Sequence, residues 1–349
     1  MKKVLLIQEV IPHYRVPIFN ELAKKVDLTI IYSKGELPEN VSFKTRYVPI
    51  VKYHYLIHKE NICKIAKEYD VVICTFNFSY LYSRLLYILP HKYKLIFWGI
   101  GVAADYNKRY DSDQKIANSL CKAIKSADAA VFYSEYPVKK YSKMGIDEGK
   151  LFVANNTVKV FESEPKDKSL ILFIGSLYKA KKIDYLLENY EKAYLKYNDI
   201  PNLVIIGNGE EYDNIIKWCQ TKKLSHKIKL CGSITDDYIL SDYFSRAIIC
   251  ISPDQAGLSV LKSMGNGVPY VTHRNAITGG EIFNIKSGEN GILIDDFEEI
   301  EKIILDCVYN KENFIQMGQN AKKHYEDNRT VEHMVQGFLD AINYVCNDK

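Results

Sequence analysis

The sequence predicts an α/β protein of two domains, each with a parallel β-sheet flanked by helices. The chain has 349 residues, and at about 150 residues per domain this length gives roughly two domains. Short apolar runs alternate with amphipathic segments, as at residues 71–75, 81–89 and 95–98. This strand–helix–strand rhythm is typical of βαβ units and therefore of parallel sheets.

The first half supplies the elements of one such sheet. Helices are predicted over residues 18–25 and 81–89, and the first of them has an apolar face formed by Phe19, Leu22 and Ala23. Buried strands are predicted over residues 4–7, 28–32, 71–75, 95–98, 129–134 and 152–155. We expect a first domain over residues 1–160, and the charged stretch 162–168 with its proline is the predicted linker.

The second half repeats the pattern. Helices are predicted from residue 183 onward, over 258–264, and over 331–345 at the end of the chain. Strands are predicted over residues 170–174, 203–206, 229–231, 248–252 and 270–272. These elements define a second domain over residues 168–328, followed by a last helical segment over 329–349.

Residues 252–272 combine the end of a strand, a turn at Gly257 and a short helix that Gly267 and Pro269 terminate. A helix that begins at the carboxyl end of a parallel strand directs its free N–H groups and its positive dipole end toward the edge where α/β sheets bind ligands. The segment is therefore a predicted phosphate-binding site.

The same stretch resembles the donor-binding segment of family 4 retaining glycosyltransferases of the GT-B fold, of the type that assembles bacterial polysaccharides. That family has an acid, seven residues and a Glu, with Gly-Leu where the helix begins and Gly-x-Pro after it. Here the acid is Asp254, the Gly-Leu is Gly257-Leu258 and the Gly-x-Pro begins at Gly267, whereas Lys262 replaces the second Glu. In the family that Glu accepts hydrogen bonds from the ribose hydroxyls of the nucleotide. The Lys262 ammonium is expected to reach Asp254 or the donor phosphates instead.

A second motif, Gly175-Ser176-Leu177 followed by Lys181, resembles the family's Gly-Arg-Leu-x-x-x-Lys-Gly loop, whose Arg and Lys neutralise the donor diphosphate. Ser176 stands at the Arg position, which Lys179 or Lys182 can compensate. Further positions follow the family's nucleotide-binding Gly-x-Gly and its Gly-Gly loop beside the donor sugar. The resemblance therefore implies donor binding by Gly175, Ser176, Lys181, Gly207, Gly209, Asp254, Ala256, Gly257, Leu258, Ser259, Lys262 and Glu281.

In the first domain, residues 12–17 resemble the Pro-x-Tyr-Arg-x-Pro loop of the polysaccharide-assembling members, which lies between acceptor and donor. Arg15 is expected to contact a phosphate and His13 an acceptor hydroxyl. The family's donor-lining His is replaced by Ile100, with Asp105 as a weak substitute. Acceptor binding is expected at His13, Tyr14, Arg15 and Asn77, and a catalytic role at Asp254, Lys181 and His13.

The resemblance implies a GT-B fold, with two Rossmann-like doubly wound domains facing a cleft and a C-terminal helix crossing back to the first. It also implies transfer of a sugar, with retention, from a nucleotide diphosphate donor to a hydroxyl of a cell-surface glycan such as capsule, O-antigen or another lipid-linked oligosaccharide. Lysines and helix N–H groups can stabilise the leaving diphosphate, so no metal or cofactor is expected. Two alternatives stay open: a nucleotide-sugar epimerase of the same fold, and a non-catalytic protein that binds sugar nucleotides.

The charge distribution suggests a partner for the first domain. Residues 1–160 hold 25 Lys and Arg against 15 Asp and Glu, a net charge of +10, whereas the remaining residues hold 22 against 28, a net charge of −6. No nucleic-acid-binding module is recognisable, so an anionic membrane surface or a pyrophosphate-linked acceptor fits better. The eight scattered cysteines and the absence of a leader or a long apolar run predict a cytoplasmic protein, with at most peripheral contact to the inner face of the plasma membrane.

Overall fold

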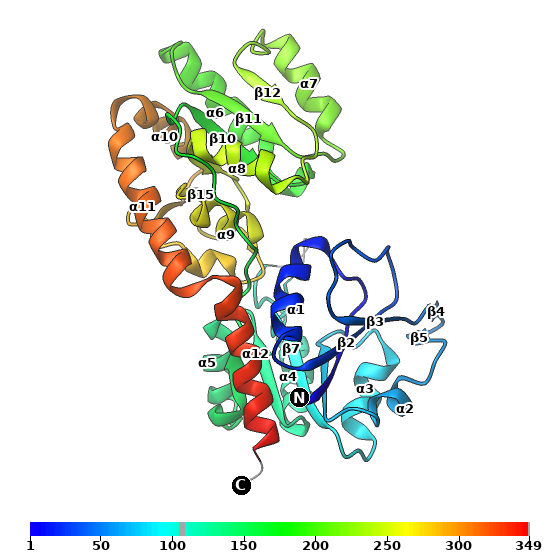
Figure 1. The fold of residues 1–349 in the computed structure, drawn as a ribbon. Coiled ribbons are helices and arrows are strands. Elements are labelled where there is room, and N and C mark those ends of the chain that lie inside the picture. The colour runs from blue at the N-terminus through cyan, green and yellow to red at the C-terminus, as the bar shows by residue number, and fades with distance from the viewer. Residues whose placement is uncertain (105–108, 348–349) are drawn as a thin grey trace. The chain divides into compact units, whose positions relative to one another are not determined.

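The computed structural model describes residues 1–104 and 109–347, which form two compact units (Figure 1). Unit 1 comprises residues 1–104, 110–159 and 330–347 of the described chain, and unit 2 comprises residue 109 and residues 160–329. The last segment of the chain therefore belongs to the same unit as the first.

Unit 1 contains a seven-stranded sheet in which every pair of neighbours is parallel. In spatial order its strands are β3 (Lys44–Tyr47), β2 (Asp27–Tyr32), β1 (Lys3–Ile7), β6 (Val71–Thr75), β7 (Lys94–Gly99), β8 (Ala129–Phe132) and β9 (Leu151–Val153). A short antiparallel hairpin, β4 (Ile50–Lys52) with β5 (Leu56–His58), lies outside this sheet. The predicted parallel sheet of the first half is confirmed.

The central strands of this sheet are buried on both faces, and alternate side chains of each strand point to opposite faces. Val4 and Leu6 belong to one apolar core, and Leu5 and Ile7 belong to another on the opposite face. The helices of unit 1 are α1 (Val16–Ala23), α2 (Ile62–Ala66), α3 (Leu81–Ile88), α4 (Gln114–Ser126), α5 (Glu135–Lys143) and α12 (Val331–Cys346), with short 3-10 turns η1 (His13–Arg15) and η2 (Glu148–Lys150).

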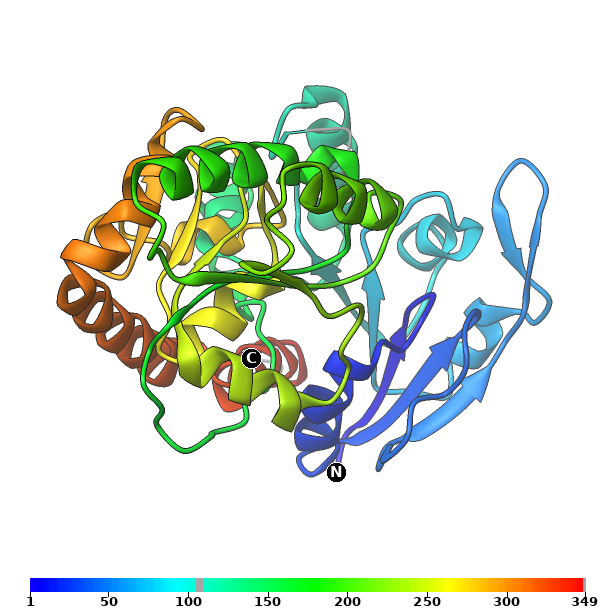
Figure 2. The same cartoon turned by 90° about the horizontal axis from the view of Figure 1, so that it is seen from above.

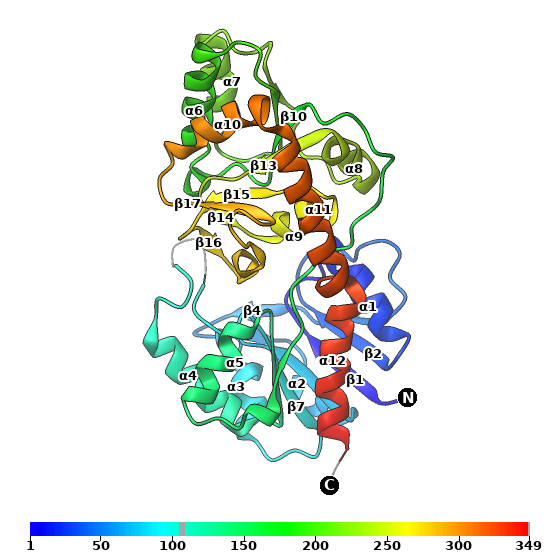
Figure 3. The ribbon, with the colours of Figure 1, turned by 90° about the vertical axis from the view of Figure 1, so that its left-hand side faces the viewer.

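The C-terminal helix α12 is part of the core of unit 1. Its buried face, which includes Met334, Phe338 and Ile342, packs with α1 and with one face of the sheet. Figures 1 and 3 show α12 (red) beside α1 (blue). This arrangement confirms the expectation that the last helix returns to the first domain.

Unit 2 contains a six-stranded sheet that is also parallel throughout. Its spatial order is β12 (Ile228–Leu230), β11 (Asn202–Ile206), β10 (Leu170–Ile174), β13 (Ala247–Ile251), β15 (Tyr270–His273) and β17 (Gly291–Ile294). Relabelled along the chain, this is the order 3-2-1-4-5-6 of a Rossmann fold, so the unit is doubly wound.

The helices of unit 2 cover both faces of its sheet. They are α6 (Ile183–Lys196), α7 (Tyr212–Thr221), α8 (Asp237–Arg246), α9 (Leu258–Gly265), α10 (Glu299–Tyr309) and α11 (Lys311–Asn328), with 3-10 turns η3 (Lys179–Lys181) and η4 (Glu281–Asn284). Two short strands, β14 (Gln255–Ala256) and β16 (Ile277–Thr278), pair with each other. None of the described helices combines the length and apolar composition that a membrane span needs.

Candidate functional site

The candidate site of unit 2 lies where its strand order reverses. β10 and β13 are adjacent at the centre of the sheet, and the chain leaves them in opposite directions, toward β11 on one side and β15 on the other. In doubly wound sheets, ligands bind beyond the carboxyl ends of strands at this switch point. The loop from Gly175 follows β10 and the loop from Ser252 follows β13, so both predicted donor motifs lie at the expected edge.

Lys181 is a buried cation in the first of these loops. It is only 7% exposed, and within the described chain no carboxylate forms an ion pair with it. Its Nζ lies 2.5 Å from where a Cβ on Gly175 would stand, so a side chain at position 175 would displace the ammonium. Burial lowers the pKa of Lys181 to about 8 because desolvation disfavours the charged form. An anion beside this ammonium would stabilise its charged form and raise its pKa again.

The other polar residues of this loop are more exposed than Lys181. Ser176, at the position of the family's Arg, is exposed, and so is Lys179. Lys182 adopts a left-handed conformation with φ of 54° at the start of α6, and its ammonium lies 5.2 Å from the ring centroids of Tyr185 and Phe297. Lys181 is thus the buried cation of the motif.

Gly207 and Gly209 allow the loop after β11 to pack backbone to backbone against the loop after β10. Their φ values are 153° and 155°, and a Cβ at either position would overlap backbone atoms, at Gly175 for the first and at Leu177 for the second. Leu177 N–H donates to the Asn208 carbonyl over 2.9 Å, and Glu211 N–H donates to the Leu177 carbonyl over 3.1 Å. The Gly-x-Gly segment therefore fixes the shape of the Lys181 loop.

The second loop is held by a feature that the sequence did not reveal, the pairing of β14 with β16. Gln255 and Ala256 pair with Ile277 and Thr278, and Asp254 accepts a backbone hydrogen bond from Ile277 over 3.0 Å. Asp254 itself is 2% exposed. The pairing joins the Asp254 loop to the loop that carries the other predicted acid, Glu281.

Helix α9 begins directly after this pairing, with Gly257 as its N-cap. Ser259 Oγ lies 2.8 Å from the hydroxyl of Tyr270, which donates to the Gln255 carbonyl over 3.0 Å. Leu258 is half-buried. Tyr270 therefore ties the first turn of α9 to β14 and fixes the direction of the N–H groups at the start of the helix.

Two further polar groups shape this edge. Glu281 is 5% exposed, and its carboxylate accepts from the Gly279 N–H over 2.9 Å and the Thr278 hydroxyl over 3.3 Å, so it fixes its own loop. Arg109, which the sequence did not single out and which clusters with unit 2, forms an ion pair with Asp254 over 2.9 Å.

Among the described residues, no group of three or more His, Cys, Asp or Glu is arranged to hold a metal ion.

Lys262 departs from the contact expected for it. We expected its ammonium to reach Asp254 or the donor phosphates, but it donates to Oδ1 of Asp237 over 2.5 Å. Asp237 opens helix α8, just after the N-cap Asp236. The Lys262 ammonium is therefore neutralised by the neighbouring helix, and the expected contact to Asp254 is wrong.

In unit 1, Arg15 belongs to the core. It is 4% exposed, donates to Asn156 Oδ1 over 2.6 Å and to Met334 Sδ over 3.3 Å, and lies 5.2 Å from the ring centroids of Trp98 and Tyr133. The guanidinium thus links the first loop to α12. These contacts give Arg15 a stabilising role in unit 1, and its phosphate contact stays a prediction.

The other residues predicted to bind the acceptor lie nearer the surface of unit 1. His13 is exposed and Tyr14 half-buried, with their ring centroids 5.8 Å apart. Asn77 is half-buried, and its side-chain oxygen accepts from the Ser79 N–H over 3.1 Å. Ile100 is half-buried after β7, and Asp105 lies outside the described residues.

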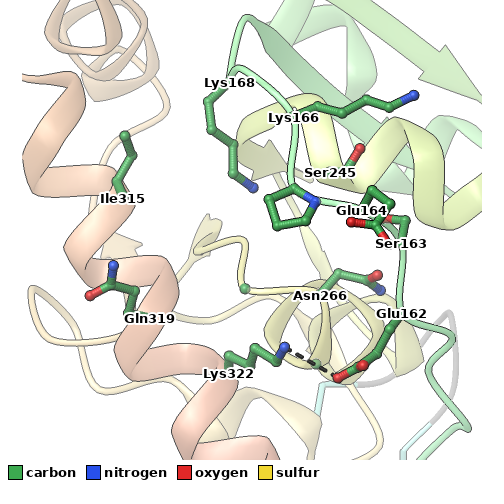
Figure 4. Close-up of a pocket in the computed structure, with 13 residues that line it drawn as sticks. Glu162, Ser163, Glu164, Lys166, Lys168, Ser245, Asn266, Ile315, Gln319 and Lys322 are labelled. Carbon is green, nitrogen blue, oxygen red and sulfur yellow. Dashed lines mark hydrogen bonds and ion pairs between the residues drawn. The ribbon is translucent and has the colours of Figure 1, made fainter.

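A cavity of about 590 Å³ opens elsewhere on unit 2 (Figure 4). Its walls are the linker around Lys168, the ends of α8 and α9 at Ser245 and Asn266, and α11 at Gln319. Lys168 donates to the Phe244 carbonyl over 3.3 Å, and burial lowers its pKa to about 8. Helices α8 and α9 both end here, and the negative dipole ends of these helices disfavour an anion.

Comparison with solved structures identifies the architecture. The crystal structure of Anabaena Alr3699/HepE in complex with UDP and glucose superimposes with a TM-score of 0.73 at 13% identity, covering 98% of this chain and 100% of that one. The two Rossmann-like units and the returning helix thus form a GT-B fold.

Comparison of sequences then indicates the class of protein. Residues 155–324 match the family model described as Glycosyl transferases group 1. An uncharacterized glycosyltransferase of Haemophilus influenzae is 28% identical over 50% of this chain and 52% of its own length. The O-antigen biosynthesis glycosyltransferase WclY of Escherichia coli is 23% identical over 93% of this chain and 92% of its own. The chain spans about half the length of the Haemophilus protein and about a third of two further curated glycosyltransferases that it matches.

Proposed function

We propose that this chain is a retaining glycosyltransferase that moves a sugar from a nucleoside diphosphate to a hydroxyl of a cell-surface glycan or lipid-linked oligosaccharide. The observation that carries the proposal is Lys181, a buried ammonium without a carboxylate partner in the described chain, at the switch point of a Rossmann sheet. The match of residues 155–324 to group 1 glycosyltransferases supports transfer over epimerisation or binding alone.

The diphosphate is bound by Lys181 on one side and by the N–H groups at the start of α9 on the other. When the bond between the sugar C1 and the diphosphate oxygen breaks, negative charge accumulates on the leaving group. The acceptor oxygen takes the sugar, and its proton passes to the departing diphosphate. A cation and helix N–H groups aimed at the diphosphate stabilise this transition state more than the ground state, so the proposed reaction needs no metal.

Lys168 provides a matched control for Lys181. Both lysines are in unit 2, and burial lowers the pKa of each to about 8, but Lys168 lines the cavity of Figure 4. We expect Lys181→Ala to lower kcat/KM for the donor by about 30-fold or more, corresponding to 2–4 kcal/mol. Lys168→Ala should leave it unchanged.

If the two variants lose the same factor in kcat/KM, the loss comes from removing a buried lysine, and the proposed phosphate contact of Lys181 is wrong. Release of free nucleoside diphosphate should also require an acceptor glycan. Interconversion of the donor sugar without acceptor would instead identify an epimerase, and binding of the donor without turnover would identify a binding protein.

A further inference from the structure

The β4–β5 hairpin of unit 1 presents an aromatic and basic tip. Its strands pair Ile50 with His58 and Lys52 with Leu56, and the turn between them is Tyr53-His54-Tyr55. The hairpin lies outside the seven-stranded sheet, and Figure 2 shows it (blue) standing out from the rest of unit 1. Its tip therefore lies outside the packing that buries the central strands of the sheet.

The base of the hairpin is firmly anchored. His58 is 9% exposed, one ring nitrogen lies 2.9 Å from the Ser33 hydroxyl, and its ring centroid lies 5.5 Å and 5.0 Å from those of Tyr80 and Tyr82. Leu56 N–H also donates to the Ser79 carbonyl over 2.9 Å. These buried contacts hold the tip in one orientation.

The tip itself combines apolar surface with positive charge. Tyr53 is 76% exposed, Val51 45% and Tyr55 40%, and the Arg84 guanidinium lies 5.2 Å from the centroid of the Tyr55 ring. Lys52 is exposed beside Tyr53. No carboxylate in the described chain forms an ion pair with Lys52 or Arg84, and residues 44–59 contain no Asp or Glu.

We propose that this tip, defined as Val51, Lys52, Tyr53, His54, Tyr55 and Arg84, docks unit 1 on an anionic lipid surface. Tyrosine favours the membrane–water interface because its ring is apolar and its hydroxyl is polar. Lysine and arginine near an anionic leaflet add electrostatic attraction. The tip carries both features, and no carboxylate of the described residues forms an ion pair with its Lys52 or Arg84. The proposal rests on the proposed function, because a lipid-linked acceptor would place the reaction at such a surface.

Vesicle co-sedimentation tests the docking. Wild type should bind phosphatidylcholine vesicles that contain about 30 mol% phosphatidylglycerol and release them at high salt, because salt screens exposed charges. The variant Lys52→Ser/Tyr53→Ser/Tyr55→Ser should bind these vesicles at least about tenfold more weakly. A matched control is Lys217→Ser/Tyr238→Ser/Tyr309→Ser on unit 2, which removes an exposed lysine and two tyrosines that are 70% and 66% exposed. The control should bind like wild type.

A second measurement reports on the tip directly. In Tyr53→Trp, indole emission should shift to shorter wavelength with the anionic vesicles and stay unchanged with pure phosphatidylcholine. Equal vesicle binding by the hairpin variant and wild type would overturn the proposal. So would an emission shift caused by a soluble oligosaccharide such as maltoheptaose in place of vesicles, because it would assign the tip to glycan binding.

UDP binding, measured by calorimetry on the same variants, separates this proposal from the proposed function. If the wild type binds UDP but does not dock on vesicles, only the docking proposal is wrong. If the wild type docks on vesicles but binds no nucleoside diphosphate, the proposed donor site is wrong and the docking proposal still holds.

Discussion

The ammonium of Lys262 lies 2.5 Å from Oδ1 of Asp237, so helix α9 and helix α8 are joined by an ion pair at the position where the resembled family has a carboxylate. A lysine has only donors and cannot accept a hydrogen bond from a ribose hydroxyl. The pair also means that a glutamate at position 262 would meet the Asp237 carboxylate. A test of ribose recognition must therefore change both residues.

We expect wild type to bind UDP and dTDP with similar affinity, and Lys262→Glu/Asp237→Asn to prefer UDP. Asparagine removes the repulsion that Lys262→Glu alone would create, and the new Glu can accept from both ribose hydroxyls, which favours ribose by about 1–3 kcal/mol. Calorimetric titration of both nucleotides into both proteins checks this, with Asp237→Asn as the control. A wild type that already prefers UDP by more than about tenfold, or 1.4 kcal/mol, would show that another group reads the 2′-hydroxyl.

Lys181→Met should stabilise the protein at pH 7 while weakening donor binding. The folded protein releases the Lys181 proton near pH 8, whereas the unfolded chain keeps it up to the ordinary pKa of 10.5. The unfolded state thus binds more protons between these values, so the penalty of burying the charge is full below pH 8 and vanishes above 10.5. Methionine avoids the penalty, and we expect a gain of about 1–3 kcal/mol in the free energy of unfolding at pH 7.

Urea denaturation at pH 7 and at alkaline pH measures this gain, which should shrink as the pH rises. A gain independent of pH would assign the effect to packing of the methionine.

Gly207→Ala should act mainly on stability, and Gly257→Ala mainly on UDP binding. A Cβ at position 207 would overlap the Gly175 carbonyl, whereas a Cβ at position 257 meets no atom within 4 Å. We expect Gly207→Ala to lower the free energy of unfolding by about 2 kcal/mol or more. Gly257→Ala should lower it by about 1 kcal/mol or less and weaken UDP binding, because its methyl group stands where the diphosphate approaches α9. Thermal unfolding with and without UDP separates the two; unimpaired UDP binding by a folded Gly257→Ala would contradict the assignment of the α9 N-terminus.

Arg15→Met should destabilise unit 1 by about 1–3 kcal/mol, because it leaves the buried Asn156 side chain without the donor that Arg15 supplies. Arg274→Met is the control: Arg274 pairs with Asp295 at the surface, where its side chain is half exposed, and such a pair contributes about 0–1 kcal/mol. Denaturant unfolding of both variants checks the comparison. Similar losses would mean that Arg15 contributes no more than a surface ion pair, and its predicted acceptor role would deserve a new test.

The sheets could be predicted from the sequence because the parallel strands are nearly continuous apolar runs. Residues 71–75 and 170–174 agree with β6 and β10 to the residue. The pleated edge strand β3 has the sequence KTRY and is mostly exposed, so it gives no apolar signal. The two-residue strands β14 and β16 are too short for any periodic pattern.

The sequence predicts the motifs of the candidate site but not the contacts that its side chains make. Spacing located Lys181, Asp254 and Gly257 on loops that the topology brings to one edge. Spacing could not show that Arg15 is buried under α12, because that contact joins residues 319 positions apart. Spacing also could not reveal that Lys262 pairs with Asp237, because Asp237 lies on helix α8 and only tertiary packing brings α8 next to α9.

The place of α12 in the core of unit 1 also sets the order in which the chain can fold during its synthesis. Nearly all of unit 2, residues 160–329, is one continuous stretch, whereas the core of unit 1 needs side chains from α1 and from Val331–Cys346 together. Domains usually fold from the N-terminal side as they emerge from the ribosome. Here one face of the unit 1 sheet lacks α12 until residues 331–346 have been made, so unit 2, which precedes them in the chain, can complete its fold before unit 1 does.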